Sequence, residues 1–194
     1  MARTPSTMLP LGTPMPAFTL PDVVSGDAVS SHEIADAPAS VVVFWCNHCP
    51  FVKHIAPRFV DFARGAMERG VKVVAISSND AAAYPDDGPE AMAELATADG
   101  YPFAYLYDES QTVAKAFSAA CTPDFYLFDG EGELAYRGQF DGSRPGNAVP
   151  VTGEDLAAAL ERVLAGEAAG DDQVPSLGCN IKWKPGNAPA YYGG

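Results

Sequence analysis

Two cysteines separated by two residues carry the clearest chemical potential in this sequence. Cys46 and Cys49 enclose Asn47 and His48, and a pair at this spacing can close a disulfide or contribute to a metal site. The pair follows a β-branched and aromatic run and precedes a segment with helical character. A helix N-terminus offers unpaired N–H groups and a positive dipole end, which stabilise a thiolate. The context predicts one thiolate that attacks disulfides or peroxides and a second thiol that resolves the product.

The histidines and the other two cysteines leave alternative interpretations of the Cys46–Cys49 pair open. His48 can add positive charge beside a sulfur, or be a solvated loop residue. A zinc site needs two further ligands, for which Cys121, Cys179, His48 and His54 are the candidates. Two buried, inert thiols are a third interpretation. Because the chain has no second C-x-x-C motif, the sequence predicts neither a metal nor an organic cofactor.

The elements around the pair predict an α/β fold. A central mixed sheet with helices on both faces is expected, preceded by a hairpin around residues 25–27 and followed by an irregular C-terminal extension. A turn at 129–132 joins two antiparallel strands. The expected strands are 41–45, 71–76, 125–128 and 133–138, and the expected helices are 49–69, 89–99, 110–119 and one that ends before residue 166.

Length and charge narrow the class of protein. The 194 residues are 47% hydrophobic and 19% charged, which predicts one domain over 1–194, with a core at about 15–165 and an extension at 166–194 that packs on the body. A net charge of −13 argues against nucleic acid and anionic membrane surfaces as partners. The start of the chain lacks the apolar centre of a secretory signal. We therefore expect a cytoplasmic protein; the sequence does not indicate its oligomeric state.

The residues around the pair resemble the thioredoxin-like superfamily. They look most like its redoxin branch, the alkyl hydroperoxide reductase/thiol-specific antioxidant group, which includes bacterial thioredoxin-like proteins with a CNHCP motif. The resemblance covers roughly residues 15–165 and implies a thioredoxin-like fold. It is carried by MPAFTLPDVVSG, VVVFWCNHCPFVKHIAP, the dipeptide TP before FYLFD, and the final helix, while the tail SLGCNIKWKPGN resembles the ends of the CNHCP proteins.

The resemblance also implies which cysteine attacks. In thioredoxins a proline follows the attacking cysteine by eight residues, as Pro57 follows Cys49 here. In peroxiredoxins a proline comes directly after the attacking cysteine, as Pro50 comes after Cys49. Cys46 stands where peroxidases have a threonine, and Val42 where they have an upstream proline. The usual rule that the first cysteine of C-x-x-C attacks names Cys46 instead.

Three further residues enter through the same resemblance. Pro123 corresponds to the cis-proline that faces the reactive thiol and shapes the substrate groove. Cys121, two residues earlier, is either a second resolving thiol or a small buried residue. Cys179 in the tail either reaches over the site or is a buried thiol.

The predicted function is thiol–disulfide exchange in redox homeostasis. Cys49 is the expected attacking thiolate, Cys46 the resolving thiol and His48 a residue that tunes them. The expected partners are protein disulfides, low-molecular-weight thiols or hydroperoxides, and a reducing dithiol donor. The alternatives are an antioxidant thiol peroxidase that reduces hydroperoxides through Cys49 and a metal-binding protein or metallochaperone.

Overall fold

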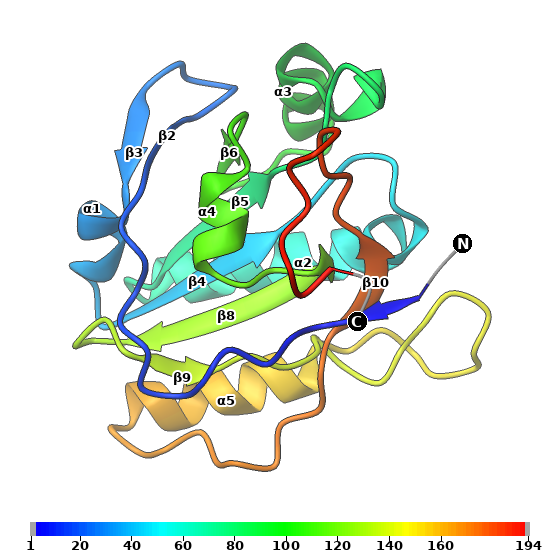
Figure 1. Ribbon diagram of the computed structural model, residues 1–194. Helices are drawn as coiled ribbons and strands as arrows, with labels where there is room; N and C mark the ends of the chain where they lie inside the picture. The colour runs from blue at the N-terminus through cyan, green and yellow to red at the C-terminus, as the bar shows by residue number, and fades with distance from the viewer. Residues whose placement is uncertain (1–2, 193–194) are drawn as a thin grey trace.

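A five-stranded mixed sheet lies at the centre of the computed structural model, which describes residues 3–192 (Figure 1). The strand order is β6-β5-β4-β8-β9. Strands β4, β5 and β6 are parallel, whereas β8 runs antiparallel to both β4 and β9. In chain order the strands are β4 (Ala39–Phe44), β5 (Lys72–Ser77), β6 (Ala104–Tyr107), β8 (Asp124–Asp129) and β9 (Leu134–Tyr136).

The central strand β4 is buried on both faces. All six of its residues are buried, as its β-branched, non-alternating sequence predicts. Val41 and Val43 belong to one hydrophobic cluster, and Val42 and Phe44 belong to a second on the opposite face. The strand therefore ends at a fixed point between two packed layers.

Helices cover both faces of this sheet (Figure 1). One layer contains α2 (Pro50–Glu68), α3 (Pro89–Ala98) and α5 (Glu154–Leu164), whose buried residues belong to the first cluster. The other layer contains α1 (Ser31–Ala35) and α4 (Thr112–Ala116), which pack with the second cluster. Apolar side chains recur along α5 at helical spacing, so one stripe of the helix faces the sheet.

Two smaller sheets accompany the central one. Strands β2 (Thr19–Pro21) and β3 (Ala28–Ser30) form the expected N-terminal hairpin. The other sheet has the order β1-β10-β7, with β1 (Thr4–Pro5), β10 (Leu177–Asn180) and β7 (Cys121–Thr122). A short 3-10 helix, η1 (Pro85–Asp87), precedes α3. Residues 177–184, called the C-terminal strap below, thus lie against residues more than fifty positions away along the chain.

The predicted α/β fold class is confirmed, with local differences. Strand β6 has no counterpart among the expected elements, and neither do α1, β1, β7 and β10, since runs of two to five residues are too short to show a period. The helix expected over 110–119 is wrong in extent, because α4 covers only Thr112–Ala116 and Ser118 adopts a positive φ of 51°. Left-handed backbone does not continue a right-handed helix.

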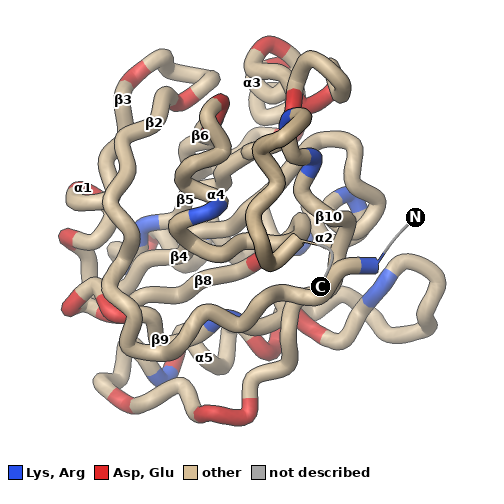
Figure 2. The backbone as a smooth tube through the Cα atoms, viewed as in Figure 1, with Lys and Arg blue, Asp and Glu red and all other residues tan. Residues whose placement is uncertain are grey.

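Most acidic residues lie around the periphery of the fold (Figure 2), whereas six of the described aspartates are buried: Asp22, Asp80, Asp87, Asp108, Asp124 and Asp141. Within residues 3–192, no helix combines the length and apolar character needed to cross a membrane.

Candidate active site

The cysteine pair lies where β4 gives way to α2. The strand ends at Phe44, and Cys49 is the N-cap residue of α2, with Pro50 as the first helical residue. Proline suits this position because its fixed φ fits the helix and its missing N–H would have no helical partner. Cys49 therefore lies at the positive end of the helix dipole, as the sequence predicts.

Thr122 holds both thiols from the opposite side. Cys49 Sγ donates to the carbonyl oxygen of Thr122 at 3.1 Å, and Cys46 Sγ lies 3.3 Å from the Thr122 hydroxyl. The Thr122–Pro123 peptide bond is cis, as the resemblance implies. Both cysteines are enclosed, with exposed fractions of 1% for Cys46 and 0% for Cys49. The site thus consists of two buried, reduced thiols beside a proline-bearing loop.

The two thiols differ in acidity. A hydrogen bond from the Cys46 thiol lowers the pKa of Cys49 to about 5, assisted by the Cys179 thiol and the backbone of Val52 and against the effect of burial. Burial raises the pKa of Cys46 well above its usual value, with further contributions from Cys49 and Asp87. Cys49 therefore ionises at lower pH than Cys46, and its hydrogen bond to the Thr122 carbonyl exists only while the sulfur keeps its proton.

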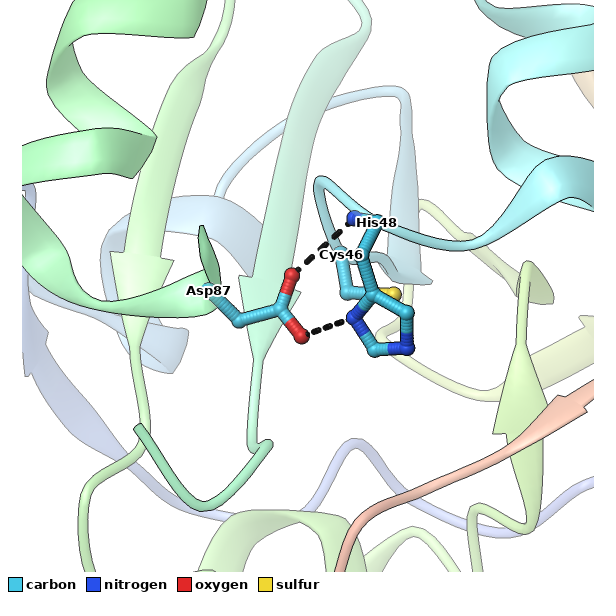
Figure 3. A group of neighbouring side chains, drawn as sticks. All are labelled: Cys46, His48 and Asp87. Atoms are coloured by element: carbon cyan, nitrogen blue, oxygen red, sulfur yellow. Dashed lines mark hydrogen bonds and ion pairs between the residues drawn. The ribbon is translucent and has the colours of Figure 1, made fainter. Parts of the chain in front are cut away.

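His48 is fixed by a buried carboxylate (Figure 3). Its Nδ1 hydrogen-bonds to Oδ2 of Asp87, and its backbone N–H donates to Oδ1 at 3.2 Å. The ring also stacks on Tyr84, with centroids 5.4 Å apart. Burial acts to raise the pKa of Asp87, but hydrogen bonds from His48 and Asn79 hold it below its usual value. The imidazole consequently has a defined orientation beside Cys46.

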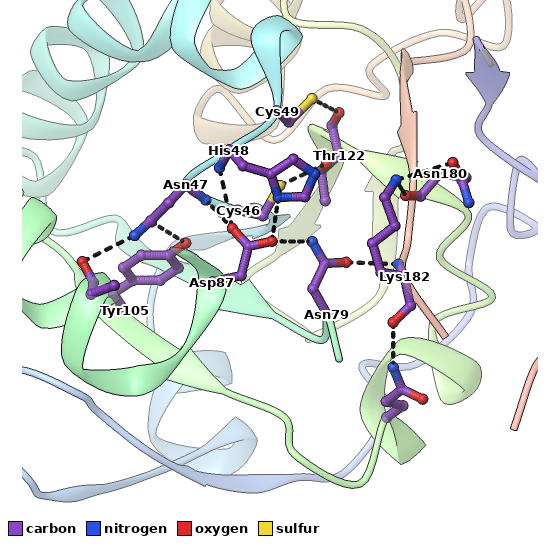
Figure 4. Close-up of polar contacts among 12 residues, drawn as sticks. Cys46, Asn47, His48, Cys49, Asn79, Asp87, Tyr105, Thr122, Asn180 and Lys182 are labelled. Carbon is purple, nitrogen blue, oxygen red and sulfur yellow. Dashed lines mark hydrogen bonds and ion pairs between the residues drawn. The ribbon is translucent and has the colours of Figure 1, made fainter. Parts of the chain in front are cut away.

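A chain of hydrogen bonds connects this histidine to the C-terminal strap (Figure 4). The amide of Asn79 donates to Asp87 Oδ2 at 2.8 Å, and Asn79 Oδ1 accepts the backbone N–H of Lys182 at 2.8 Å. The carbonyl of Lys182 accepts in turn from the backbone N–H of Asp80 and the side chain of Gln111. The strap is thereby anchored next to the site.

One group of side chains has the composition of a partial metal site. Cys46, His48 and Asp87 offer ligand atoms that all lie within 4.8 Å of one another. However, the Asp87 carboxylate already accepts from the backbone N–H groups of Asn47 and His48, from His48 Nδ1 and from Asn79. A carboxylate has about four lone-pair sites, so a metal would have to displace these donors. The residues present fit a hydrogen-bonded pair better than a metal centre.

The other candidate residues differ in whether a hydrogen bond connects them to the cysteine pair. Cys179 contacts Cys49 through its thiol and its backbone, whereas the Cys121 thiol is directed to the carbonyl of Pro123 at 3.6 Å. His54 bonds to the Ser143 hydroxyl at 2.7 Å through Nε2. The structure therefore brings Cys46, Cys49 and Cys179 together.

Two residues at the site were not anticipated from the sequence. Asp87 and Asn79 both follow β5, and their contacts with the 47–49 segment depend on the tertiary fold. The polar run 77–80 directly after a buried parallel strand is the signal that could have indicated Asn79, since binding residues gather at the carboxyl ends of such strands. Asp87 lies in a separate loop and has no comparable signal.

A mixed sheet between two helical layers, with cysteines at a helix N-terminus beside a cis-proline, defines a thioredoxin-like redox protein. The model of the AhpC/TSA family matches residues 11–137, and the chain belongs to that family.

Known proteins resemble this chain to different extents. A crystal structure of an uncharacterised conserved protein from Geobacillus kaustophilus is 52% identical, with a TM-score of 0.93 over 95% of this chain and 98% of that one. A thiol:disulfide interchange protein of the thioredoxin family from Chlorobium tepidum shares the fold, with a TM-score of 0.59, 19% identity, and coverage of 82% and 97%.

One curated relative carries a functional name. The thiol:disulfide interchange protein DsbE of Allochromatium vinosum is 26% identical over 125 residues. The match covers 64% of this chain and 64% of that relative, which is less than two thirds of its length.

Proposed function

We propose that the protein is a thiol–disulfide oxidoreductase in which Cys49 attacks and Cys46 resolves. The observation that carries the proposal is the contact of the two thiols at the start of α2, with a pKa of about 5 for Cys49. A low thiol pKa makes the thiolate, which is the nucleophile, available at neutral pH. The relationship to a thiol:disulfide interchange protein supports the same activity.

The proposed reaction has two exchange steps. The Cys49 thiolate attacks one sulfur of a substrate disulfide, forms a mixed disulfide and releases the other sulfur as a thiolate. Cys46 then loses its proton to the departing sulfur and attacks Cys49, which gives the Cys46–Cys49 disulfide and a second substrate thiol. A reducing dithiol donor, in the proposed cytoplasmic setting, returns the pair to two thiols. His48, oriented by Asp87, is the proposed tuning residue, and Pro123 the residue that lines the substrate side.

A thiol peroxidase that uses Cys49 is the second candidate. The observation that favours it is the 0% exposure of Cys49, because a small hydroperoxide reaches an enclosed sulfur more readily than a folded protein does. In that reaction the thiolate takes one oxygen from the hydroperoxide and releases an alcohol or water, which leaves a sulfenic acid.

Parallel rate measurements test the proposal. The reduced protein is mixed with hydrogen peroxide or with a model protein disulfide, and oxidation of its own cysteines is followed by alkylation and mass spectrometry for the wild type and for Cys49→Ser. We expect the protein disulfide to oxidise the wild type in a single turnover, and this oxidation should disappear in the variant. Faster consumption of peroxide would reverse the order of the two candidates, and equal rates for wild type and Cys49→Ser would contradict both.

A further inference from the structure

The strap places a third thiol against the reactive sulfur. Strand β10 pairs with β7 so that Cys179 is opposite Thr122, the residue that contacts the other two thiols. Cys179 is 3% exposed and packs in the same cluster as Cys46 and Cys49. The sulfur of Cys49 therefore has thiol neighbours on two sides, one from its own loop and one from the far end of the chain.

A glycine allows this close approach. A Cβ atom on Gly178 would lie 2.0 Å from the carbonyl oxygen of Thr122, which is far inside van der Waals contact. Glycine is the residue that permits one backbone to lie this close to another. Because of Gly178, the strap lies directly against the Thr122–Pro123 segment, and the next residue, Cys179, is brought to the two thiols that Thr122 contacts.

The charged groups around the two neighbours of Cys49 differ in sign. Burial raises the pKa of Cys179 to about 12, a hydrogen bond and charge from Cys49 add to this, and Lys182 acts to lower it. For Cys46 the charge of Asp87 acts in the opposite direction and raises the pKa. Oxidation of Cys49 removes its negative charge, after which Lys182 still acts to lower the pKa of Cys179, whereas Asp87, which is paired with His48, still acts to raise the pKa of Cys46. The electrostatic difference favours a thiolate at Cys179.

We propose that Cys179 is a resolving thiol for oxidised Cys49, and that a Cys49–Cys179 disulfide links the strap to the start of α2. This inference rests on the proposed function, because Cys49 must first be oxidised by a substrate disulfide. It competes with resolution by Cys46. The two products differ in structure: a Cys46–Cys49 bond closes a small ring within one loop, whereas a Cys49–Cys179 bond fastens the last strand over the site.

The step is balanced without an added oxidant. Attack of Cys49 on a substrate disulfide has already formed a Cys49–substrate bond and released one substrate thiolate. The Cys179 sulfur then forms a bond to Cys49 Sγ as the Cys49–substrate bond breaks, and the departing sulfur takes the Cys179 proton. Cys49 and Cys179 together lose two electrons and two protons, and the substrate disulfide becomes two thiols.

Peptide mapping of selected variants tests the inference. Reduced wild type, Cys46→Ser, Cys46→Ser/Cys179→Ser and the control Cys121→Ser are treated with one equivalent of 2-hydroxyethyl disulfide, quenched with N-ethylmaleimide and digested. Serine keeps a hydrogen-bond donor at position 46. We expect cross-linked peptides containing Cys49 and Cys179 in wild type, Cys121→Ser and Cys46→Ser. The double variant should retain the mercaptoethanol adduct on Cys49 at least tenfold longer than Cys46→Ser.

The outcomes separate this inference from the proposed function. If Cys46→Ser keeps the adduct on Cys49 while Cys179 is alkylated, the inference fails and the role of Cys49 stands. If Cys49 remains unmodified in every variant, both fail. The wild-type map provides a check independent of how the variants fold, because complete absence of the Cys49–Cys179 peptide there also contradicts the inference.

Discussion

The β4–α2 junction and the C-terminal strap supply the same site in different ways. The junction places Cys46 and Cys49 by local geometry, because a strand end and a helix start fix both within a few residues. The strap reaches the site only through long-range pairing with β7 and hydrogen bonds to Asn79 and Gln111. Local geometry thus provides the reactive pair, and tertiary packing provides its enclosure.

Removal of the Cys49 sulfur should abolish the disulfide-exchange activity that we propose for the β4–α2 junction. We expect Cys49→Ser to reduce disulfide exchange to the uncatalysed rate, because a hydroxyl is not ionised near neutral pH and does not attack disulfides as a thiolate does. Cys121→Ser is the matched control, since that thiol points to the Pro123 carbonyl. Exchange is measured with a fluorescent disulfide peptide. Residual activity in Cys49→Ser that disappears in Cys46→Ser would assign the attack to Cys46.

The pH dependence of alkylation should distinguish the cysteines. With a pKa of about 5, Cys49 is almost fully ionised at pH 7, and its reaction with iodoacetamide should fall tenfold per unit below about pH 5. The raised pKa values of Cys46 and Cys179 leave thiolate fractions of roughly one hundredth or less at pH 7. Peptide-resolved mass spectrometry measures each rate. Equal rates for the three cysteines in the folded protein would contradict this ordering.

Gly178→Ala should loosen the packing of the strap over Cys49 without altering the β4–α2 junction. Gly178→Ala introduces a Cβ atom that would meet the Thr122 carbonyl, and overpacking of this kind costs about 2 kcal/mol. We expect a lower free energy of unfolding in urea and faster alkylation of Cys49. Gly65→Ala is the control, because that helical glycine has open space around its Cβ position. Unchanged stability and alkylation in Gly178→Ala would show that the strap is not seated tightly.

Asp124, a buried carboxylate at the start of β8, should make the free energy of unfolding depend on pH. Burial raises the pKa of Asp124 to about 7, so the folded state keeps a proton that the unfolded state loses near pH 4. Stability contributed by this group is therefore complete below pH 4 and is lost as pH rises to 7, by up to about 1.4 kcal/mol per unit. Asp124→Asn should remove this slope in urea unfolding series between pH 4 and pH 7. An identical slope in the variant would locate the pH dependence elsewhere.

The contrast between the two regions also explains what could be predicted from the sequence. The apolar run of β4 and the proline after Cys49 are local signals, and they indicated the fold class and the helix start correctly. The contact of Cys179 with Cys49 depends on pairing across more than fifty residues. The roles of Asp87 and Asn79 likewise arise from loops that meet only after folding. Sequence periodicity carries no information on such contacts.

The late position of β10 in the chain has a consequence for biosynthesis. A ribosome delivers residues 31–164, with the central sheet and its helices, before it delivers the strand that pairs with β7. During that interval the body can assemble while the acidic thiol remains uncovered, so the nascent protein is more vulnerable to oxidants than the finished one.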